Sequence, residues 1–255
     1  INPKTGKAAS PKTVKDSDLA ALKSVFGWAV ANNKLDGNPA EGVTVKVNKR
    51  KKSRPNYFRE DERYKILNQS RHYHSKGRER EKLSRAKRWI PWICAYTGAR
   101  VGEIAQLRKQ DIRLEEGVWI INITPEAGDV KSKAAREVPI HNHLIEVGLI
   151  EMVREARDGY LFIDVEPGKH PRGKVQTLKN DLAEFVRIVV PDPDIQPNHG
   201  WRHTFRTLAR EIQGIDSKVI DDIVGHAPKS VGDRYGESTI KARAMVMQRF
   251  PRFID

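Results

Sequence analysis

Two short segments with strand-forming residues most constrain the fold of this chain, VWIINI (118–123) and REVPI (136–140). β-Branched and aromatic residues favour strands, and the polar connection GDVKSKAA between the two segments favours a turn. The pattern predicts a small antiparallel hairpin or sheet. The segment YLFI (160–163) is a candidate for one further short strand.

The other regular segments place apolar residues at helical spacing. The predicted helices cover about 60–69, 82–96, 141–156, 175–189, 199–213, 216–225 and 238–249, with one more starting in ARVGEIAQL. We expect a kink at Pro91, because proline removes a helical hydrogen bond, and a helix end at Gly98, because glycine suits the position after a helix. The predicted fold class is mainly α with a small antiparallel β-sheet (α+β).

The first 47 residues carry one clear helical pattern. Ser17 and Asp18 are candidate N-caps, and the pattern ends near Asn32. Its apolar positions are Leu19, Leu22, Phe26 and Ala29. About fifty residues with one or two such helices cannot bury an apolar face alone. We therefore expect the end of a longer helical domain, and a first residue that is Ile rather than Met favours a fragment of a longer chain.

The chain has a formal net charge of +14, and most of it lies in one segment. Between Lys46 and Arg88 there are 17 Lys and Arg against 5 Asp and Glu, a net charge of +12. This favours a polyanionic partner, above all nucleic acid, over a solvated, salt-bridged surface. No amphipathic helix rich in aromatic and basic residues accompanies the charge, so a membrane partner is not expected. The candidate DNA-binding residues are Lys49, Arg50, Lys51, Lys52 and Arg54.

The single cysteine, Cys94, excludes an internal disulfide and a cysteine-based zinc site. It lies in the apolar run WIPWICAY, which favours a buried position. The sequence shows no signal peptide and no apolar run near 18 residues. We expect a cytoplasmic protein of a bacterial host or its phage.

Two segments combine the residue types of a phosphate site. In TGARVGEIAQL a glycine turn delivers Arg100 to a helix start, and Glu103 follows on the same face. Arg100 is therefore expected to meet either Glu103 or the phosphate of a ligand. In HGWRHTF, His199 and Arg202 share a helix face near a helix start at Pro197, where phosphates bind well.

Neither HGWRHTF nor the later segment HAPKSVGDRY is decisive alone. In the first, His203 and Arg206 compete with the neighbouring pair, because adjacent helix positions cannot all face one site. In the second, Tyr235 follows nine residues after His226, which suits packing as well as catalysis.

Together and in this order, TGARVGEIAQL, VKSKAAREVPIH, HGWRHTF and GHAPKSVGDRY resemble the tyrosine recombinase (phage integrase) family. The four motifs lie within about Tyr57 to Phe250. The upstream segment AALKSVFGWAVANNKLDGNPA is similar to the end of the helical core-binding (SAM-like) domain of this family. The resemblance implies three parts: the end of that domain at 1–47, a basic linker at 48–56, and a catalytic domain at 57–255.

The resemblance also implies a role for each motif residue. Arg100 and Arg202 clamp the phosphate, and Tyr235 is the nucleophile. His199 is the histidine of the HxxR motif, His226 is the second histidine, and Glu103 has a supporting role. The hairpin lysine is Lys131, eight residues before Pro139, with Lys133 as the alternative. This chain has KSVG where the family more often has small polar residues. The resemblance therefore does not determine the conformation of the loop that leads to Tyr235.

The chemistry of strand cleavage suits these residue types. Two arginines can stabilise the negative charge that develops on the phosphate, and loss of one such donor costs roughly 3–4 kcal/mol in other enzymes. The phenol, with an ordinary pKa near 10, needs a base or a cationic field, which histidines supply. A lysine can protonate the leaving 5′-oxygen. We expect no metal and no cofactor, because the arginines provide the positive charge.

The resemblance implies a site-specific recombinase or integrase that forms a 3′-phosphotyrosine intermediate, from a phage or an integrative element. It implies double-stranded recombination sites as partner, a homotetramer on DNA, accessory DNA-bending factors and a nucleoid location. The helix in STIKARAMVMQRF either contacts another protomer or packs on its own domain. The alternatives are an inactive DNA-binding relative, a type IB topoisomerase or telomere resolvase, and a metal phosphoesterase, which would need carboxylates near the histidines.

Overall fold

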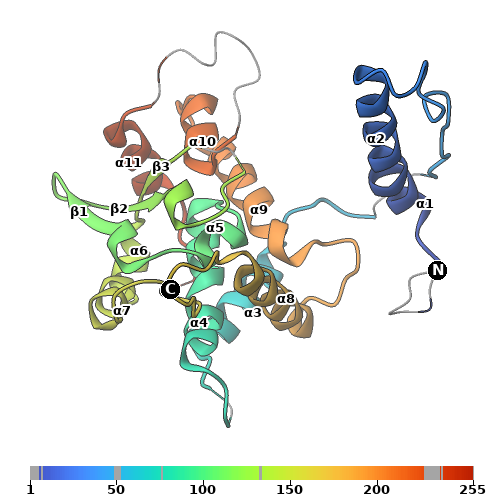
Figure 1. Ribbon diagram of the computed structural model, residues 1–255. Coiled ribbons are helices and arrows are strands. Elements are labelled where there is room, and N and C mark those ends of the chain that lie inside the picture. Colours follow the sequence, from blue (N-terminus) through green and yellow to red (C-terminus); the bar gives the residue numbers. More distant parts are fainter. Residues whose placement is uncertain are drawn as a thin grey trace. The chain divides into compact units, whose positions relative to one another are not determined.

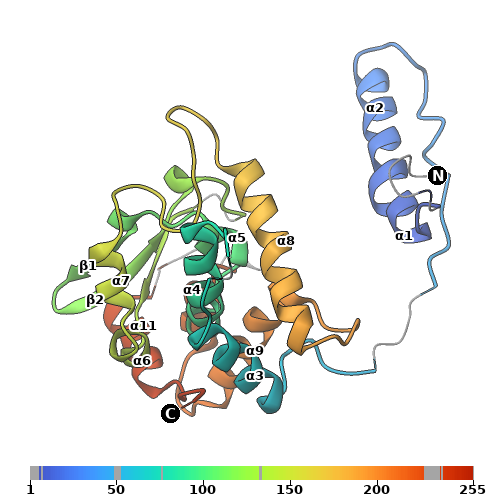
Figure 2. The same ribbon diagram turned by 90° about the horizontal axis from the view of Figure 1, so that it is seen from below.

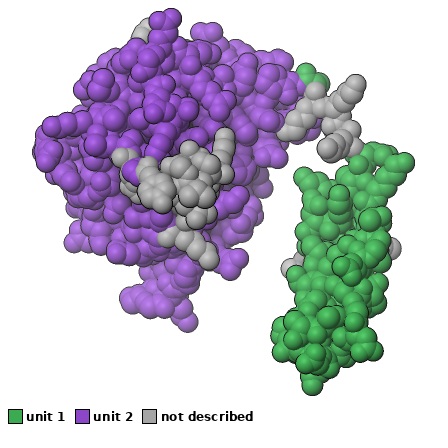
Figure 3. All heavy atoms as spheres, turned by 90° about the horizontal axis from the view of Figure 1, so that it is seen from above, with its two compact units in different colours: residues 1–53 green, residues 54–255 purple. Residues whose placement is uncertain are grey.

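The computed structural model describes residues 6, 8–48, 53–75, 77–131, 134–226, 236 and 238–254. The chain forms two compact units, Ile1–Ser53 and Arg54–Asp255, which Figure 3 colours separately. The division falls inside the segment 48–56 that the sequence predicts as a linker. None of the helices in the described part of the chain combines the length and the hydropathy that a bilayer span requires.

Unit 1 contains one long helical stretch (Figure 1). Its elements are α1 (Pro11–Thr13), the π-helical segment η1 (Val14–Leu19) and α2 (Ala20–Ala31). The prediction of Ser17 or Asp18 as N-cap is wrong, because the side chain of Ser10 accepts a hydrogen bond from the Thr13 backbone at 3.0 Å. Pro11 follows at the first helical position, where its missing N–H costs nothing, so the helix starts earlier than predicted.

Unit 2 is mainly helical with a small sheet, so the predicted fold class is confirmed. Its helices are α3 (Glu60–Arg71), α4 (Glu81–Thr97), α5 (Val101–Ala105), α6 (Asn142–Glu146), α7 (Leu149–Glu155), α8 (Arg172–Val189), α9 (Pro197–Glu211), α10 (Ser217–Val224) and α11 (Ile240–Arg249). The short 3₁₀ turns are η2 (Lys109–Asp111) and η3 (Pro125–Ala127). The predicted helix 141–156 is divided into α6 and α7, because Gly148 has φ +93° between them.

The sheet has three antiparallel strands in the order β1 (Ile112–Glu115), β2 (Val118–Ile123) and β3 (Arg136–Pro139). Ile121 pairs with Ile112 on one side and with Val138 on the other. The predicted hairpin of β2 and β3 is confirmed, and the sequence analysis missed β1. The predicted strand at 160–163 is wrong: in the described part of the chain, Tyr160 makes only an isolated bridge to Arg108.

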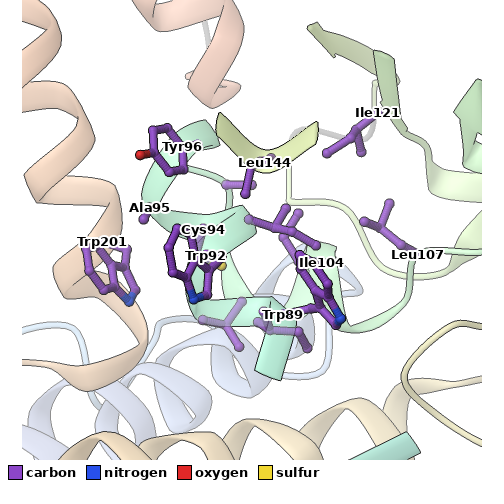
Figure 4. Close-up of a cluster of buried hydrophobic side chains, with 14 of the residues drawn as sticks. Trp89, Trp92, Cys94, Ala95, Tyr96, Ile104, Leu107, Ile121, Leu144 and Trp201 are labelled. Atoms are coloured by element: carbon purple, nitrogen blue, oxygen red, sulfur yellow. The ribbon is translucent and has the colours of Figure 1, made fainter. Parts of the chain in front are cut away.

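Helix α4 runs through the core of unit 2 (Figure 4). Trp92, Cys94 and Tyr96 are fully buried, and Trp201 of α9 lies beside them. Pro91 lies inside α4 and does not end it. Burying this helix on several sides explains its continuous apolar run, because an amphipathic helix would leave one face in water.

Gly98 ends α4 in the left-handed conformation, with φ +59°. A Cβ atom at this position would lie 2.8 Å from Val224 of α10 and 2.9 Å from Phe205 of α9. The turn therefore requires glycine at this position for two reasons, its left-handed backbone conformation and the close approach of two helices. This turn leads directly to Arg100, which is the N-cap of α5.

Helix α11 packs on its own unit, against β3 and α10 (Figure 1). Val246 and Met247 are buried, and the Arg243 side chain donates to the backbone carbonyl of Glu137 in β3 at 2.8 Å. His141, just after β3, contacts the carbonyl of Phe250 at 3.0 Å. The structure thus favours packing within the domain, one of the two alternatives for this helix.

Candidate active site

The α4–α5 turn places Arg100 beside Glu103. The guanidinium donates to one carboxylate oxygen at 2.8 Å, and the Arg100 backbone N–H donates to the other at 3.1 Å. The Glu103 side chain is buried, whereas the Arg100 side chain keeps about a fifth of its surface exposed, 21%. Arg100 therefore has a fixed orientation from Glu103 and a free side for a ligand.

A second arginine holds Glu103 from the opposite side. Arg136, the first residue of β3, donates to the carboxylate at 2.5 Å and to the backbone carbonyl of Ile223 in α10 at 3.1 Å. Burial disfavours the ionised carboxylate, but the charges and hydrogen bonds of Arg136 and Arg100 outweigh it and lower the pKa of Glu103. The sequence analysis missed Arg136, although it shares the core-facing side of β3 with Val138.

Arg202 is buried at the centre of the site. Its guanidinium donates to the carbonyls of Gly98, at 3.0 Å, and Val224, and more weakly to that of Gly225, at 3.5 Å. Burial and the neighbouring charge of Arg100 lower the pKa of Arg202 to about 9. These three acceptors are neutral carbonyls, so the positive charge of Arg202 is available to an anion.

Arg100, Lys131 and His199 line one cavity of about 530 Å³. Lys179 and Arg172 of α8 line it as well. Helices α8 and α9 lie side by side (Figures 1 and 2). The structure therefore brings three of the predicted catalytic residues, from three separate segments, to one opening, together with the supporting Glu103. The contribution of α8 was missed, because its basic residues belong to none of the four motifs.

His199 lies in the first turn of α9. Burial, then the charges of His203 and Arg100, lower its pKa, so the imidazole is neutral at pH 7. The neighbouring Asn198 side chain donates to the carbonyl of Lys179 at 2.9 Å and fixes this end of α9 on α8. A neutral imidazole at the cavity wall has a lone pair that can accept a proton.

Lys131 is exposed in a turn before β3, and not in an extended strand. The Gln106 side chain donates to the carbonyl of Asp129 at 3.2 Å, which ties the start of this turn to the end of α5. The alternative, Lys133, lies outside the described residues. The same holds for Tyr235 and for Lys49, Arg50, Lys51 and Lys52.

His226 follows Gly225, which ends α10 with φ +68°. Its Nε2 atom lies 3.1 Å from Nη1 of Arg206, and its backbone N–H donates to the carbonyl of Asp221 at 2.9 Å. Burial, then the charges of Arg206 and Arg202, lower the pKa of His226 to about 4. The carbonyl of Gly225 faces Arg202, so His226 is adjacent to the buried arginine.

The prediction of Arg54 as a DNA-binding residue is wrong. Its side chain is buried and donates to both oxygens of Glu62, at 2.5 and 2.6 Å, and to Asp192 at 3.1 Å. These carboxylates raise its pKa, Glu62 most of all. Arg54 therefore anchors the start of unit 2, because Glu62 would otherwise be a buried carboxylate without a cation.

Part of the basic segment 46–88 is also ion-paired. Each of four cations on α3 and α4 has a carboxylate within 3.0 Å, and these cations are Lys65, Lys82, Arg85 and Lys87. For these residues the salt-bridged surface describes the structure better than a phosphate-binding surface. Other cations of unit 2, namely Arg100, Lys131, Lys179 and Arg172, line the cavity.

The site as a whole fits a phosphodiester. Arg100 and Arg202 offer two guanidinium groups, of which one is fixed by Glu103 and the other by backbone carbonyls. A preorganised pair of cations stabilises charge at the phosphate without having to reorganise during the reaction. Lys131 and the neutral His199 add a proton donor and a proton acceptor at the same cavity.

Comparison with known proteins supports this reading. The family model described as the phage integrase family matches residues 44–241. Tyrosine recombinase XerA of Pyrococcus horikoshii is 26% identical over 224 residues, which are 88% of this chain and 68% of that protein. Tyrosine recombinase XerC of Escherichia coli is 26% identical over 221 residues, 85% of this chain and 67% of that protein.

Solved structures share the fold. The integrase from mycobacterium phage Brujita has a TM-score of 0.54 at 19% identity, over 97% of this chain and 75% of that one. A lambda integrase(75-356) dimer bound to a COC′ core site has a TM-score of 0.56 at 18% identity, over 87% of this chain and 73% of that one. Because the family model covers most of the chain, the chain belongs to the phage integrase family of tyrosine recombinases.

Proposed function

We propose that this recombinase cleaves and rejoins DNA at specific sites, with Tyr235 as the nucleophile. The observation that carries the proposal is the convergence of Arg100, Lys131 and His199 on one cavity, next to the buried charge of Arg202. These four residues come from three separate segments of the sequence, with His199 and Arg202 on the same helix. A surface that merely bound DNA would not need a buried arginine and a neutral histidine at the same point.

The first step is binding of the scissile phosphate. Arg100 and Arg202 donate charge-assisted hydrogen bonds to its non-bridging oxygens. Glu103 and the carbonyl of Gly98 hold the two guanidinium groups before DNA arrives. The negative charge of the transition state is therefore met by cations already in place.

In the cleavage step the phenol oxygen of Tyr235 forms a bond to phosphorus, and the bond to the 5′-oxygen breaks. The phenol proton moves to the neutral imidazole of His199, and Lys131 gives a proton to the leaving 5′-oxygen. A 3′-phosphotyrosine and a free 5′-hydroxyl result. One phosphate ester replaces another, so a 5′-hydroxyl of a second strand can reverse the step without an external energy source.

The proposed partner is double-stranded DNA that carries recombination sites. Among the fold relatives, XerH was solved bound to its difH substrate (TM-score 0.54, 18% identity). Lambda integrase was solved as a tetramer bound to a Holliday junction (TM-score 0.53, 17% identity). By analogy we propose a homotetramer on two duplexes, helped by DNA-bending proteins. We further propose an origin in a phage or integrative element and action at the nucleoid of a bacterial host.

Covalent trapping tests the proposed function. The full chain is incubated with nicked duplexes taken from the DNA that flanks its gene, and adducts are separated under denaturing conditions. The wild type should form a protein–DNA adduct, and Tyr235→Phe should form none while still shifting the same DNA. Tyr64→Phe, an exposed tyrosine on α3, is the matched control and should behave as wild type. An adduct with Tyr235→Phe, or none with Tyr64→Phe, would contradict the assignment.

A further inference from the structure

Arg206 of α9, Asp221 of α10 and His226 form a closed ring of contacts. Arg206 of α9 donates through Nη2 to Oδ1 of Asp221 at 2.8 Å, and its Nη1 lies 3.1 Å from Nε2 of His226. The backbone of His226 returns to the carbonyl of Asp221 at 2.9 Å. Asp221 thus fixes both the guanidinium that faces the imidazole and the chain that carries the imidazole.

The contact between Arg206 and His226 decides which ring nitrogen carries the proton. A guanidinium has only N–H donors and no acceptor. Nε2 of His226 must therefore be the acceptor in this hydrogen bond, and it is not protonated. A neutral imidazole whose Nε2 is bare carries its proton on Nδ1. Nδ1 lies 3.7 Å from Oδ1 of Asp221, which is too long for a hydrogen bond.

We propose that Arg206 is a positioning residue that sets the tautomer of His226, so that the neutral ring carries its proton on Nδ1 and offers the site an N–H donor instead of a base. The inference rests on the proposed strand-cleavage function. In this proposal His226 donates a hydrogen bond and accepts no proton, because the lone pair on its Nε2 is already occupied by Arg206. The proton of Tyr235 then goes to His199, the other imidazole of the site.

The charges around His226 favour the neutral ring. Arg206 and Arg202 face it from α9, Arg100 from the turn before α5, and Arg136 of β3 lies against the adjacent Gly225. The carboxylate of Asp221 opposes these cations but is paired with Arg206. With a pKa of about 4, roughly one His226 in a thousand is protonated at pH 7. The hydrogen bond that His226 offers is therefore the same across the neutral pH range.

Nitrogen NMR on the full chain tests the tautomer directly. The protein is labelled with ¹⁵N-histidine, without DNA, and the signals of the eight histidines are compared with those of His226→Gln to assign His226. The ¹⁵N chemical shifts distinguish a protonated ring nitrogen from a bare one. We expect Nδ1 to be protonated and Nε2 to be bare from pH 8 down to pH 5.5. A proton on Nε2, or a charged ring at pH 7, would overturn the proposal with no variant needed.

Arg206→Ala gives the second arm, with Arg210→Ala as control on the exposed side of the same helix. Arg206→Ala should move the His226 titration upward by at least one pH unit and mix the two tautomers, while Arg210→Ala leaves both unchanged. In covalent trapping, Arg206→Ala should gain a second titration between about 5.5 and 7.5, the range of an ordinary histidine, in addition to the pH profile of wild type. Unchanged His226 signals in Arg206→Ala would refute the role of Arg206. A failed Tyr235 adduct would refute the proposed function and leave the tautomer result standing.

Discussion

Arg136 and Glu103 form a buried ion pair between strand β3 and helix α5, with 2.5 Å between Nη2 and Oε2. The same guanidinium reaches the carbonyl of Ile223 in α10, just before His226. One side chain therefore ties together the element that follows Arg100 and the element that precedes the second histidine. A single buried residue therefore fixes the position of both segments relative to each other.

Removing Arg136 should destabilise unit 2. Arg136→Ala leaves Glu103 buried with only Arg100 as partner, and loss of one member of a buried pair costs about 3–5 kcal/mol. Arg113→Ala is the matched control, because Arg113 pairs with Glu137 and Glu115 at the surface. Exposed pairs contribute about 1 kcal/mol or less. Denaturant unfolding measures both values, and equal losses for the two variants would contradict the role given to Arg136.

The lowered pKa of Glu103 predicts a contribution to stability that depends on pH. A carboxyl with a depressed pKa stabilises the fold fully above its ordinary pKa, here 4.5, and loses that effect as the pH falls through the folded value. Glu103→Gln should therefore unfold more easily than wild type at pH 7, with a difference that shrinks below about pH 4.5. Glu166→Gln, an exposed carboxylate, should show no such convergence in unfolding measured from pH 7 to pH 3.

Gly98→Ala should cost more than an ordinary glycine substitution. The left-handed backbone alone costs about 1–2 kcal/mol for a residue with a Cβ atom, and at Gly98 that atom would also press on Val224 and Phe205. Gly159→Ala is the control, since it has φ +94° and nothing within 4 Å of its Cβ position. Thermal unfolding should show a clearly larger loss for Gly98→Ala, accompanied by weaker covalent trapping because Arg100 moves. Equal losses of thermal stability for the two variants would mean that α9 and α10 accommodate the added methyl group at no energetic cost.

The identity of the general acid can be tested with a sulfur-bridged substrate. Lys131→Ala should cleave ordinary DNA very slowly and recover when sulfur replaces the 5′-bridging oxygen, because a thiolate leaves without a proton. Arg100→Ala should stay slow on both substrates, since its role is charge stabilisation at the phosphate. Single-turnover cleavage rates of each variant on the two substrates provide the measurement. Rescue of Lys133→Ala in place of Lys131→Ala would assign the acid to the other lysine.

Substitutions in the linker and at Arg54 should differ in their effect on the salt dependence of DNA binding. Combined substitution of Lys49, Arg50, Lys51 and Lys52 by alanine should reduce the slope of log K against log salt by about 3 to 4, if each contacts one phosphate. Arg54→Ala should leave that slope unchanged and instead lower the free energy of unfolding by about 3 kcal/mol, because Glu62 loses its partner. Binding titrations at several salt concentrations distinguish the two. An unchanged slope for the fourfold variant would mean that the linker does not touch DNA.

Much of the architecture was determined locally. The apolar run of α4, the glycine after it and the strand-forming residues of β2 and β3 predicted these elements, because helical periodicity, capping and β-propensity act over a few residues. The four motifs were also sufficient to indicate the family. The start of the first helix was predicted wrongly by the same local logic, since Ser10 and Pro11 form a better cap than Ser17 or Asp18.

Only the tertiary structure decided which charged side chains share a buried space. Arg54 and Arg136 look like surface cations in the sequence, yet folding places them against Glu62 and Glu103, where a carboxylate requires a cation. Arg206 follows three residues after His203 in the sequence, yet its side chain contacts His226, twenty residues away. Spacing along the chain determines the face of a helix on which a residue lies. The partner across that face, and hence the proton that a histidine carries, depends on the packing of whole elements.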